Sequence, residues 1–328
     1  MIIYWIGFLA LVVGLLALDL GVFHRKTHII KTREALLWTL FWITLALLFV
    51  GFIYFAYEQN WLGIGSIPGH VQNGSDAALK YLTGYIIEKS LSLDNIFVIA
   101  MIFAYFNVPA QFQHRVLFWG ILGALVLRGI MIAVGAALIQ KFNWMIYVFG
   151  LFLILTAVKM LLTRHDAIEP DKNPLVRLAR KLYPVTPDYR ESHFFAHLEG
   201  APAITPMFLV LLVIESSDVL FAVDSIPAIF AVTTDPFLVF TSNVFAILGL
   251  RSLYFVLAAM ISRFRYIKIS LVFILAYVGV KMLLSHLHPI PTWISLCVIA
   301  ASLTAGITAS LAASTPNPKK PNPPPSPH

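Results

Sequence analysis

The sequence predicts an all-α protein that crosses a membrane several times. Hydrophobic residues make up 59% of the 328 residues, charged residues make up only 12%, and the apolar residues form long uninterrupted runs. Soluble globular proteins carry about 25% charged residues. A chain with half that share is therefore typical of a polytopic membrane protein.

Nine runs have the length of a membrane helix, which needs about 20 mostly apolar residues. They are residues 3–23, 35–57, 78–106, 112–139, 144–163, 204–231, 236–261, 267–286 and 291–313. The first run has no basic residue ahead of its apolar part, and a basic cluster follows it. This pattern indicates a retained span rather than a signal peptide.

The charges of the loops predict the orientation. Basic residues gather in residues 24–33, in residues 164–203, after the seventh span and in the tail, and the predicted spans place all of these on one side. The positive-inside rule makes that side the cytoplasm of a cell-membrane protein, with the N-terminus outside and the C-terminus inside. Because loop charge explains the net charge of +7, we expect no nucleic-acid partner.

Two segments lie outside the predicted spans. Residues 164–203 mix charged residues with prolines and are expected to form a cytoplasmic linker with a short surface helix. Residues 314–328 are proline-rich and lack apolar anchors, which predicts a disordered cytoplasmic tail.

An internal repeat relates two groups of three predicted spans. Each group has an Ile-Glu pair followed by an aspartate, then Ile-Leu-Gly followed by an arginine, and closes on Lys-Met-Leu-Leu. Three is an odd number, so the second group would enter the membrane from the opposite side, as in an inverted three-plus-three repeat. The predicted transmembrane domain, residues 1–313, then consists of repeat one (78–163), the linker, repeat two (204–286) and peripheral helices at 3–57 and 291–313.

Buried charge is the main functional signal. The third and sixth predicted spans contain five acids: Glu88, Asp94, Glu215, Asp218 and Asp224. A carboxylate at the centre of a membrane helix costs about 2.5–3.5 kcal/mol on insertion scales, so these acids need compensating partners. One such partner is a bound divalent cation. The others are basic residues of neighbouring spans: Arg128, Lys159, Arg251 and Lys281. Ion pairs that only hold the helices together are the structural alternative.

The spacing of the acids raises a geometric question. Asp224 lies six residues beyond Asp218, so a regular helix would direct the two side chains to different faces. Local unwinding near Pro227 would bring them together, because Ser225 and Asn95 can compete for backbone hydrogen bonds. Transporters build midplane ion sites from such broken helices. A wide cavity lined by regular helices is the alternative.

The available ligand atoms indicate a hard cation. Carboxylates supplemented by the oxygens of Asn95, Ser217 and Ser225 suit magnesium, calcium or manganese better than zinc or copper. The histidines lie mostly in loops or at span ends, and the one cysteine, Cys297, is expected to be packed and inert. Asp19, near the end of the first span, either caps a helix boundary or lines an access path.

Three stretches carry a family resemblance. They are residues 19–26 (Asp-Leu-Gly-Val-Phe-His-Arg-Lys), residues 82–95, and residues 215–254, which include Phe-Ala-Val-Asp-Ser-Ile-Pro-Ala-Ile-Phe. In these stretches the chain resembles the TerC family of membrane proteins. The resemblance implies a transporter related to lysine-type exporters, with links to manganese efflux and, historically, to tellurite resistance. It also implies that the five acids are the family's motif positions. Ser217 stands where many relatives would have threonine, and it keeps the hydroxyl.

The leading functional hypothesis is a divalent-cation transporter that exports manganese from the cytoplasm, with protons as the coupling ion. In this hypothesis manganese is the transported ion, no resident cofactor is expected, and the protein is not an enzyme. The alternatives are a metal-dependent membrane enzyme and a membrane assembly or partner protein whose acids are structural. A zinc protease would require His-Glu-x-x-His, which the sequence lacks. Calcium or an oxyanion could also be the transported species.

Overall fold

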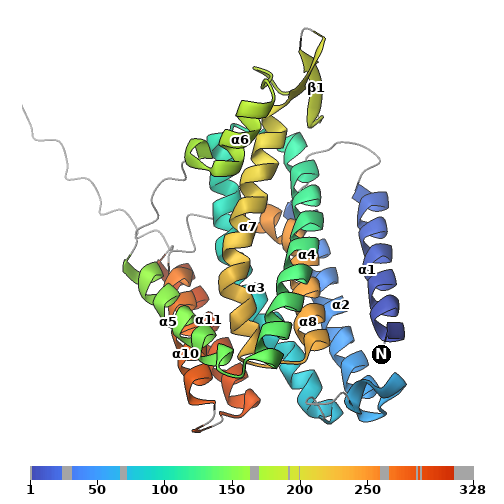
Figure 1. Cartoon of the computed structure of the whole chain (residues 1–328), viewed down its shortest axis with the longest axis vertical. Helices are drawn as coiled ribbons and strands as arrows, with labels where there is room; N and C mark the ends of the chain where they lie inside the picture. The colour runs from blue at the N-terminus through green and yellow to red at the C-terminus, as the bar shows by residue number, and fades with distance from the viewer. Residues whose placement is uncertain are drawn as a thin grey trace, which may run out of the picture.

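A computed structural model describes residues 2–23, 32–66, 72–162, 170–190, 193–198, 200–258, 266–285, 287–288 and 290–313. These residues form a helical bundle with one small hairpin at one end (Figure 1). The helices are α1 (Ile2–Phe23), α2 (Thr32–Glu58), η1 (Trp61–Ser66), α3 (Gly74–Tyr105), α4 (Ala110–Lys141), α5 (Met145–Leu162), η2 (Pro170–Lys172), α6 (Pro174–Leu182), α7 (Pro206–Phe230), α8 (Pro236–Leu248), α9 (Leu250–Ala258), α10 (Ile267–Leu284) and α11 (Thr292–Ala313). The strands β1 (Phe195–Leu198) and β2 (Ala201–Ile204) pair antiparallel.

The predicted class, an all-α multi-pass membrane protein, is confirmed. In the described part of the chain, six helices are long and apolar enough to span a membrane, and a seventh span results if α8 and α9 are counted as one bent helix. α3 is not among these six helices, because every 18-residue stretch of it contains at least three charged residues. These are Glu88, Lys89 and either Lys80 or Asp94. The apolar stretch of α1, Ile3–Asp19, is shorter than a full span. Nine spans therefore remain a prediction.

Four helices form the centre of the bundle. Both α3 and α4 pack against both α7 and α8, while α1 and α2 lie to one side and α5, α10 and α11 to the other (Figure 1). Small residues permit the close approach of these helices, as is usual in membranes. For example, a Cβ added to Gly84 would lie 2.9 Å from the hydroxyl of Ser242. The predicted acids lie on α3 and α7, so this central group contains the candidate site.

The contact between α5 and α10 depends on two glycines. A Cβ on Gly279 would lie 2.8 Å from the Gly150 carbonyl oxygen and 2.8 Å from Ile154 Cγ1. A Cβ on Gly150 would in turn lie 3.0 Å from the Gly279 carbonyl oxygen. Each glycine therefore allows the other's backbone to approach.

Gly279→Ala should consequently lower the thermal unfolding temperature of the detergent-solubilised protein. The methyl group forces α5 and α10 apart, and such overpacking typically costs about 1–3 kcal/mol. Gly51→Ala in α2 is the matched control, because open space surrounds its Cβ position and alanine favours a helix interior by up to about 1 kcal/mol. An unfolding temperature of Gly279→Ala at or above that of the wild type would contradict this packing argument.

The linker between α5 and α7 contains more structure than expected. The predicted short helix is present as α6, but the β1–β2 hairpin was not predicted. Tyr189 fixes the linker to the bundle by donating a hydrogen bond to the Phe106 carbonyl oxygen at 2.8 Å. Burial raises the pKa of Tyr189 to about 12, so the hydroxyl stays protonated at neutral pH and remains a donor.

Two further expectations can be compared with the described residues. Cys297, expected to be packed, is exposed on α11, because it lies two residues from both Ser295 and Ile299, which occupy the buried face. The predicted disordered tail, residues 314–328, lies outside the described residues, as do the basic residues of 24–31.

Candidate cation site at the centre of the bundle

An arginine joins two of the predicted acids. Arg128 of α4 donates from Nη1 to Oε1 of Glu88 in α3, and from Nη2 to Oδ1 of Asp218 in α7 at 2.7 Å. Its Nε also donates to Oδ2 of Asp218 at 3.2 Å, which completes a two-pronged contact with that carboxylate. Glu88 is 0% exposed and Arg128 is 2% exposed. Each of the three residues lies within three positions of its helix midpoint, so this network occupies the middle of the bundle.

Two neutral side chains extend the network. Asn243 of α8 donates from Nδ2 to Oε2 of Glu88 at 3.3 Å, and Arg128 Nη1 lies 3.3 Å from the Ser225 hydroxyl. Oδ1 of Asn243 is buried and has no hydrogen-bond partner among the described residues. Asn243 is not among the residues predicted from the sequence, although an amide inside an apolar span is itself a signal of function.

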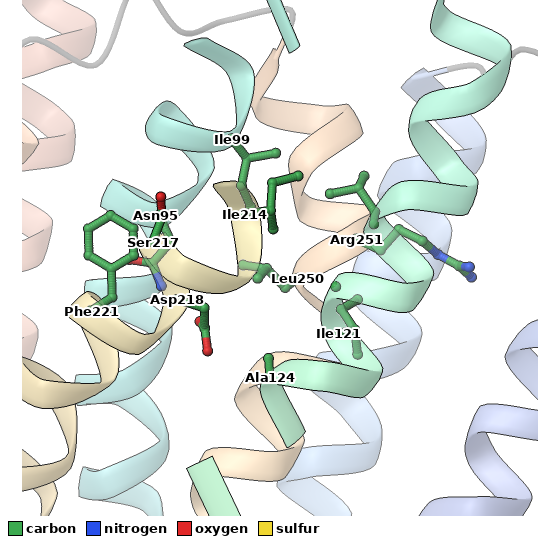
Figure 2. A pocket seen from close by; sticks show the side chains of 12 residues that line it. Asn95, Ile99, Ile121, Ala124, Ile214, Ser217, Asp218, Phe221, Leu250 and Arg251 are labelled. Atoms are coloured by element: carbon green, nitrogen blue, oxygen red, sulfur yellow. The ribbon is translucent and has the colours of Figure 1, made fainter. Parts of the chain in front are cut away.

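A cavity of about 30 Å³ lies beside Asp218, between α3, α4, α7 and α9. Figure 2 shows Asn95, Ser217 and Asp218 on one side of it, with apolar residues such as Ile121 and Leu250 across from them. Asn95 is closer than Glu88 to the end of α3 that meets the linker, so the cavity approaches the network from the linker side. The secondary ligand positions Asn95 and Ser217 are thus next to Asp218.

Glu215 lies one helical turn from Asp218. Gly123 of α4 faces it, and a Cβ at that position would overlap the Glu215 carboxylate. The carboxylate therefore fills the space that the glycine leaves open. Its Oε2 atom is buried without a hydrogen-bond partner in the described part of the chain, which leaves a strong acceptor available inside the bundle.

Asp224 faces a different neighbour. It accepts a hydrogen bond from Thr156 Oγ1 of α5 at 3.0 Å, and Lys159, one turn further along α5, acts on it electrostatically. The compensating role of Lys159 toward this acid stays a prediction. Lys281 instead donates to the Ser295 hydroxyl of α11 at 2.8 Å.

Arg251 pairs with an acid outside the predicted five. Its Nη2 donates to Oδ1 of Asp19 in α1, and both side chains are buried. The chain bends by 42° between α8 and α9, at Gly249, two residues before Arg251. Figure 2 shows the Arg251 side chain pointing away from Asp218. Asp19 is thus an ion-pair partner on α1.

The expected unwinding is absent at both predicted places. α3 continues without a break through Asp94 and Asn95, and α7 continues through Asp224. Pro227, three residues before the end of α7, lies inside the helix without ending it. The broken span is the α8–α9 pair instead.

The five acids do not converge in this conformation. No three acidic, histidine or cysteine side chains in the described ranges gather closely enough to hold a metal ion. Glu88 and Asp218 meet through Arg128, Glu215 lies a turn away, and Asp224 faces α5. An arginine guanidinium thus holds the position between two carboxylates in the middle of the bundle.

The chain was compared with known proteins. A Myxococcus xanthus protein, called an uncharacterized membrane protein, is 52% identical over 307 residues, covering 94% of this chain and 91% of its own length. A Rickettsia bellii protein, also called an uncharacterized membrane protein, is 42% identical and covers 94% and 96%. A Salmonella typhi protein named "Putative membrane-bound redox modulator Alx" is 46% identical over 301 residues, covering 92% and 91%.

No solved structure matches the chain. Residues 73–317 match the model of the integral membrane protein TerC family. This match begins just before α3, includes the linker, and contains Glu88, Arg128 and Asp218. The chain therefore belongs to the TerC family of integral membrane proteins.

Proposed function

We propose that this protein exports a divalent metal cation, Mn²⁺, from the cytoplasm across the cell membrane. The buried network of Glu88, Arg128 and Asp218 is the observation that carries the proposal. Two carboxylates share one guanidinium, so one negative charge remains uncompensated within this trio. A dication in place of the guanidinium would neutralise both carboxylates. The arginine and the metal thus compete for the same two ligands.

The chemistry of the surrounding donors supports a hard cation. Next to Asp218, the Asn95 amide and the Ser217 hydroxyl line the cavity, and Glu215 has a buried acceptor oxygen without a hydrogen bond to a described residue. Carboxylate, amide and hydroxyl oxygens are the ligands that Mn²⁺ shares with Mg²⁺ and Ca²⁺. The cation would reach Asp218 from the linker side, through the cavity.

The packing of the helices supports an inverted repeat. In the proposed repeat, α3 corresponds to α7, α4 to the α8–α9 pair, and α5 to α10. Exchanging the two halves then turns the contact between α3 and α8 into the contact between α7 and α4, and both contacts are present. Each helix also contacts its own counterpart, as expected where two related halves meet around a two-fold axis. These contacts are α3 with α7, α4 with α8, and α5 with α10. Two such halves could rock against each other around the central network, which would expose it alternately to each side.

The name of the Salmonella typhi relative assigns redox modulation to that protein. In this chain the only cysteine is Cys297, so an intrachain dithiol–disulfide cycle is excluded. Buried carboxylates can bind a cation directly, whereas they take no part in thiol exchange. We therefore favour transport, without a chemical reaction on a substrate, as the activity of this chain.

Proton exchange gives the proposal its sharpest test. Carboxylates released by the metal inside the bundle favour the protonated form, so metal loading should release protons. Purified protein is placed in vesicles with its cytoplasmic face outward and a pH-sensitive dye inside. External Mn²⁺ should enter while the lumen becomes more alkaline, faster at higher external pH, and Asp224→Asn should abolish the alkalinisation. Manganese flux without proton movement at any imposed gradient would indicate a channel or uniporter. Absence of manganese flux would refute the proposal.

The proposed nine spans predict opposite locations for the chain ends. Figure 1 places the start of α1 at the end of the bundle away from α6 and the hairpin, as expected if the linker is cytoplasmic and the N-terminus is outside. Reporters fused at Met1 and His328 should therefore report the outside and the cytoplasm, respectively. Signals from the same side would require an even number of spans and would eliminate the inverted repeat as proposed.

A further inference from the structure

A large apolar pocket lies between α1, α2, η1 and α8, away from the central network. Its volume is about 560 Å³, within the range of about 300–1,000 Å³ that is typical of ligand sites. Aromatic rings form much of its wall, among them Phe8, Phe49, Phe237 and Phe245. The Tyr4 hydroxyl is one of the few polar groups there. A ligand that fills this pocket must therefore be almost entirely apolar.

The pocket is continuous with the lipid-facing surface of the bundle. Leu48 and Leu62, which line it, are 68% and 59% exposed, and Phe52 is exposed as well. In a protein that spans a membrane, exposed side chains on a span such as α2 contact lipid. The pocket therefore opens toward the acyl chains of the bilayer.

The dimensions of the pocket match one leaflet. Its lining on α2 extends from Leu45 to Ala56, which corresponds to about 16 Å at 1.5 Å per residue. Half of the hydrocarbon core of a bilayer is about 15 Å. Trp61, in η1 just beyond α2, lines the same end of the pocket, and tryptophan is enriched at the membrane–water interface. The pocket thus extends from the interface about halfway into the membrane.

We propose that this pocket binds an acyl chain of a phospholipid from the leaflet on the η1 side. The bound chain would pack on Phe237 and Phe245 of α8. Asn243 lies two residues from Phe245, on the other side of that helix, and contacts Glu88. The lipid would therefore support, from outside, the helix that contributes Asn243 to the central network. The inference rests on the pocket and not on the identity of the transported ion.

Two glycines of α1 provide a matched pair of variants. Gly7 lines the pocket and Gly14, seven residues further on, does not. Both have open space around their Cβ positions, and a spacing of seven places them on nearly the same helix face. Gly7→Phe should fill the pocket, whereas Gly14→Phe adds the same ring outside it. Leu48→Trp, at the exposed rim, is a second way to narrow the opening.

The test uses phosphatidylethanolamine with a photoreactive diazirine in one acyl chain, mixed into vesicles that contain each purified variant. After illumination, mass spectrometry locates the labelled peptides. Wild type and Gly14→Phe should be labelled on the pocket-lining segments of α1, α2 and α8, and Gly7→Phe and Leu48→Trp should lose at least five-fold of this labelling. Labelling of the exposed face of α5 serves as the internal reference.

Equal labelling of the pocket segments in wild type, Gly7→Phe and Leu48→Trp would overturn the proposal, because the lipid would then contact only the outer surface. Lipid extracts of each purified variant are analysed in parallel. If an isoprenoid quinone or another non-phospholipid molecule is retained by wild type and Gly14→Phe but lost from Gly7→Phe, that molecule is the occupant and the phospholipid assignment is wrong.

Discussion

Asp218→Asn should reduce manganese transport at least tenfold while leaving the protein in the membrane. Asp218 both lines the cavity and holds Arg128 with two oxygens. The amide keeps the shape of the side chain but removes its negative charge, so the site loses a ligand for a dication. We expect the same direction for Glu88→Gln, Asp94→Asn, Glu215→Gln and Asp224→Asn.

The control for this prediction is Asp76→Asn. Asp76 is half exposed near the start of α3 and pairs with Lys80 at 2.6 Å, outside the central network. Its replacement should leave transport within about twofold of wild type, because exposed pairs contribute little. Manganese, zinc and copper uptake into vesicles should be measured for all variants. Normal manganese uptake by Asp218→Asn would place the site elsewhere, and a dependence of zinc uptake on Asp218 would contradict the assignment to a hard cation.

Arg128→Met should destabilise the protein strongly. Breaking a buried ion pair by removing one partner costs about 3–5 kcal/mol, because the remaining charge stays buried without compensation. Here two carboxylates, Glu88 and Asp218, would be left. Arg180→Met is the control, since Arg180 pairs with Asp171 at the surface, is 46% exposed, and should contribute only about 0–1 kcal/mol.

Two additional measurements distinguish a cation site from a purely structural network. The triple variant Arg128→Met, Glu88→Gln, Asp218→Asn should regain most of the lost thermal stability, because no unpaired charge of this network remains. Mn²⁺ should raise the unfolding temperature of Arg128→Met more than that of the wild type, because the metal no longer competes with the guanidinium. If manganese stabilises neither protein and the triple variant transports manganese normally, the network only holds helices together.

The positions of the acids along the chain and the basic residues available to them were predictable, but which acid pairs with which basic residue was not. Carboxylates within apolar runs are visible in any sequence, because their cost in lipid does not depend on the rest of the fold. Arg128 and Arg251 follow the same Ile-Leu-Gly segment in the two repeats, yet one pairs with Glu88 and Asp218 and the other with Asp19. Arg128 lies five residues after Gly123, whereas Arg251 lies only two residues after Gly249, where the chain bends by 42°. The two side chains therefore extend toward different neighbours.

Two features of the backbone were likewise not predicted from the sequence. Pro227 and the serines of α7 are the residues expected of an unwound helix, but α7 is continuous through them, and the bend occurs at Gly249. The β1–β2 hairpin is too short for its alternation to be recognised. Gly200, which adopts a φ of +84° in the turn, was the available signal.

The sequence by itself determined the class of the protein, the positions of most helices, the presence of acids inside them and membership of a family. These depend on composition and on local apolar runs, which act within one helix. Only the tertiary structure decided that Arg128 stands between Glu88 and Asp218, that Asn243 joins them, and that α1, α2 and α8 enclose an apolar pocket. Those features depend on how each helix is rotated and bent against its neighbours, because a shift of one residue turns a side chain by about 100° and exchanges one partner for another.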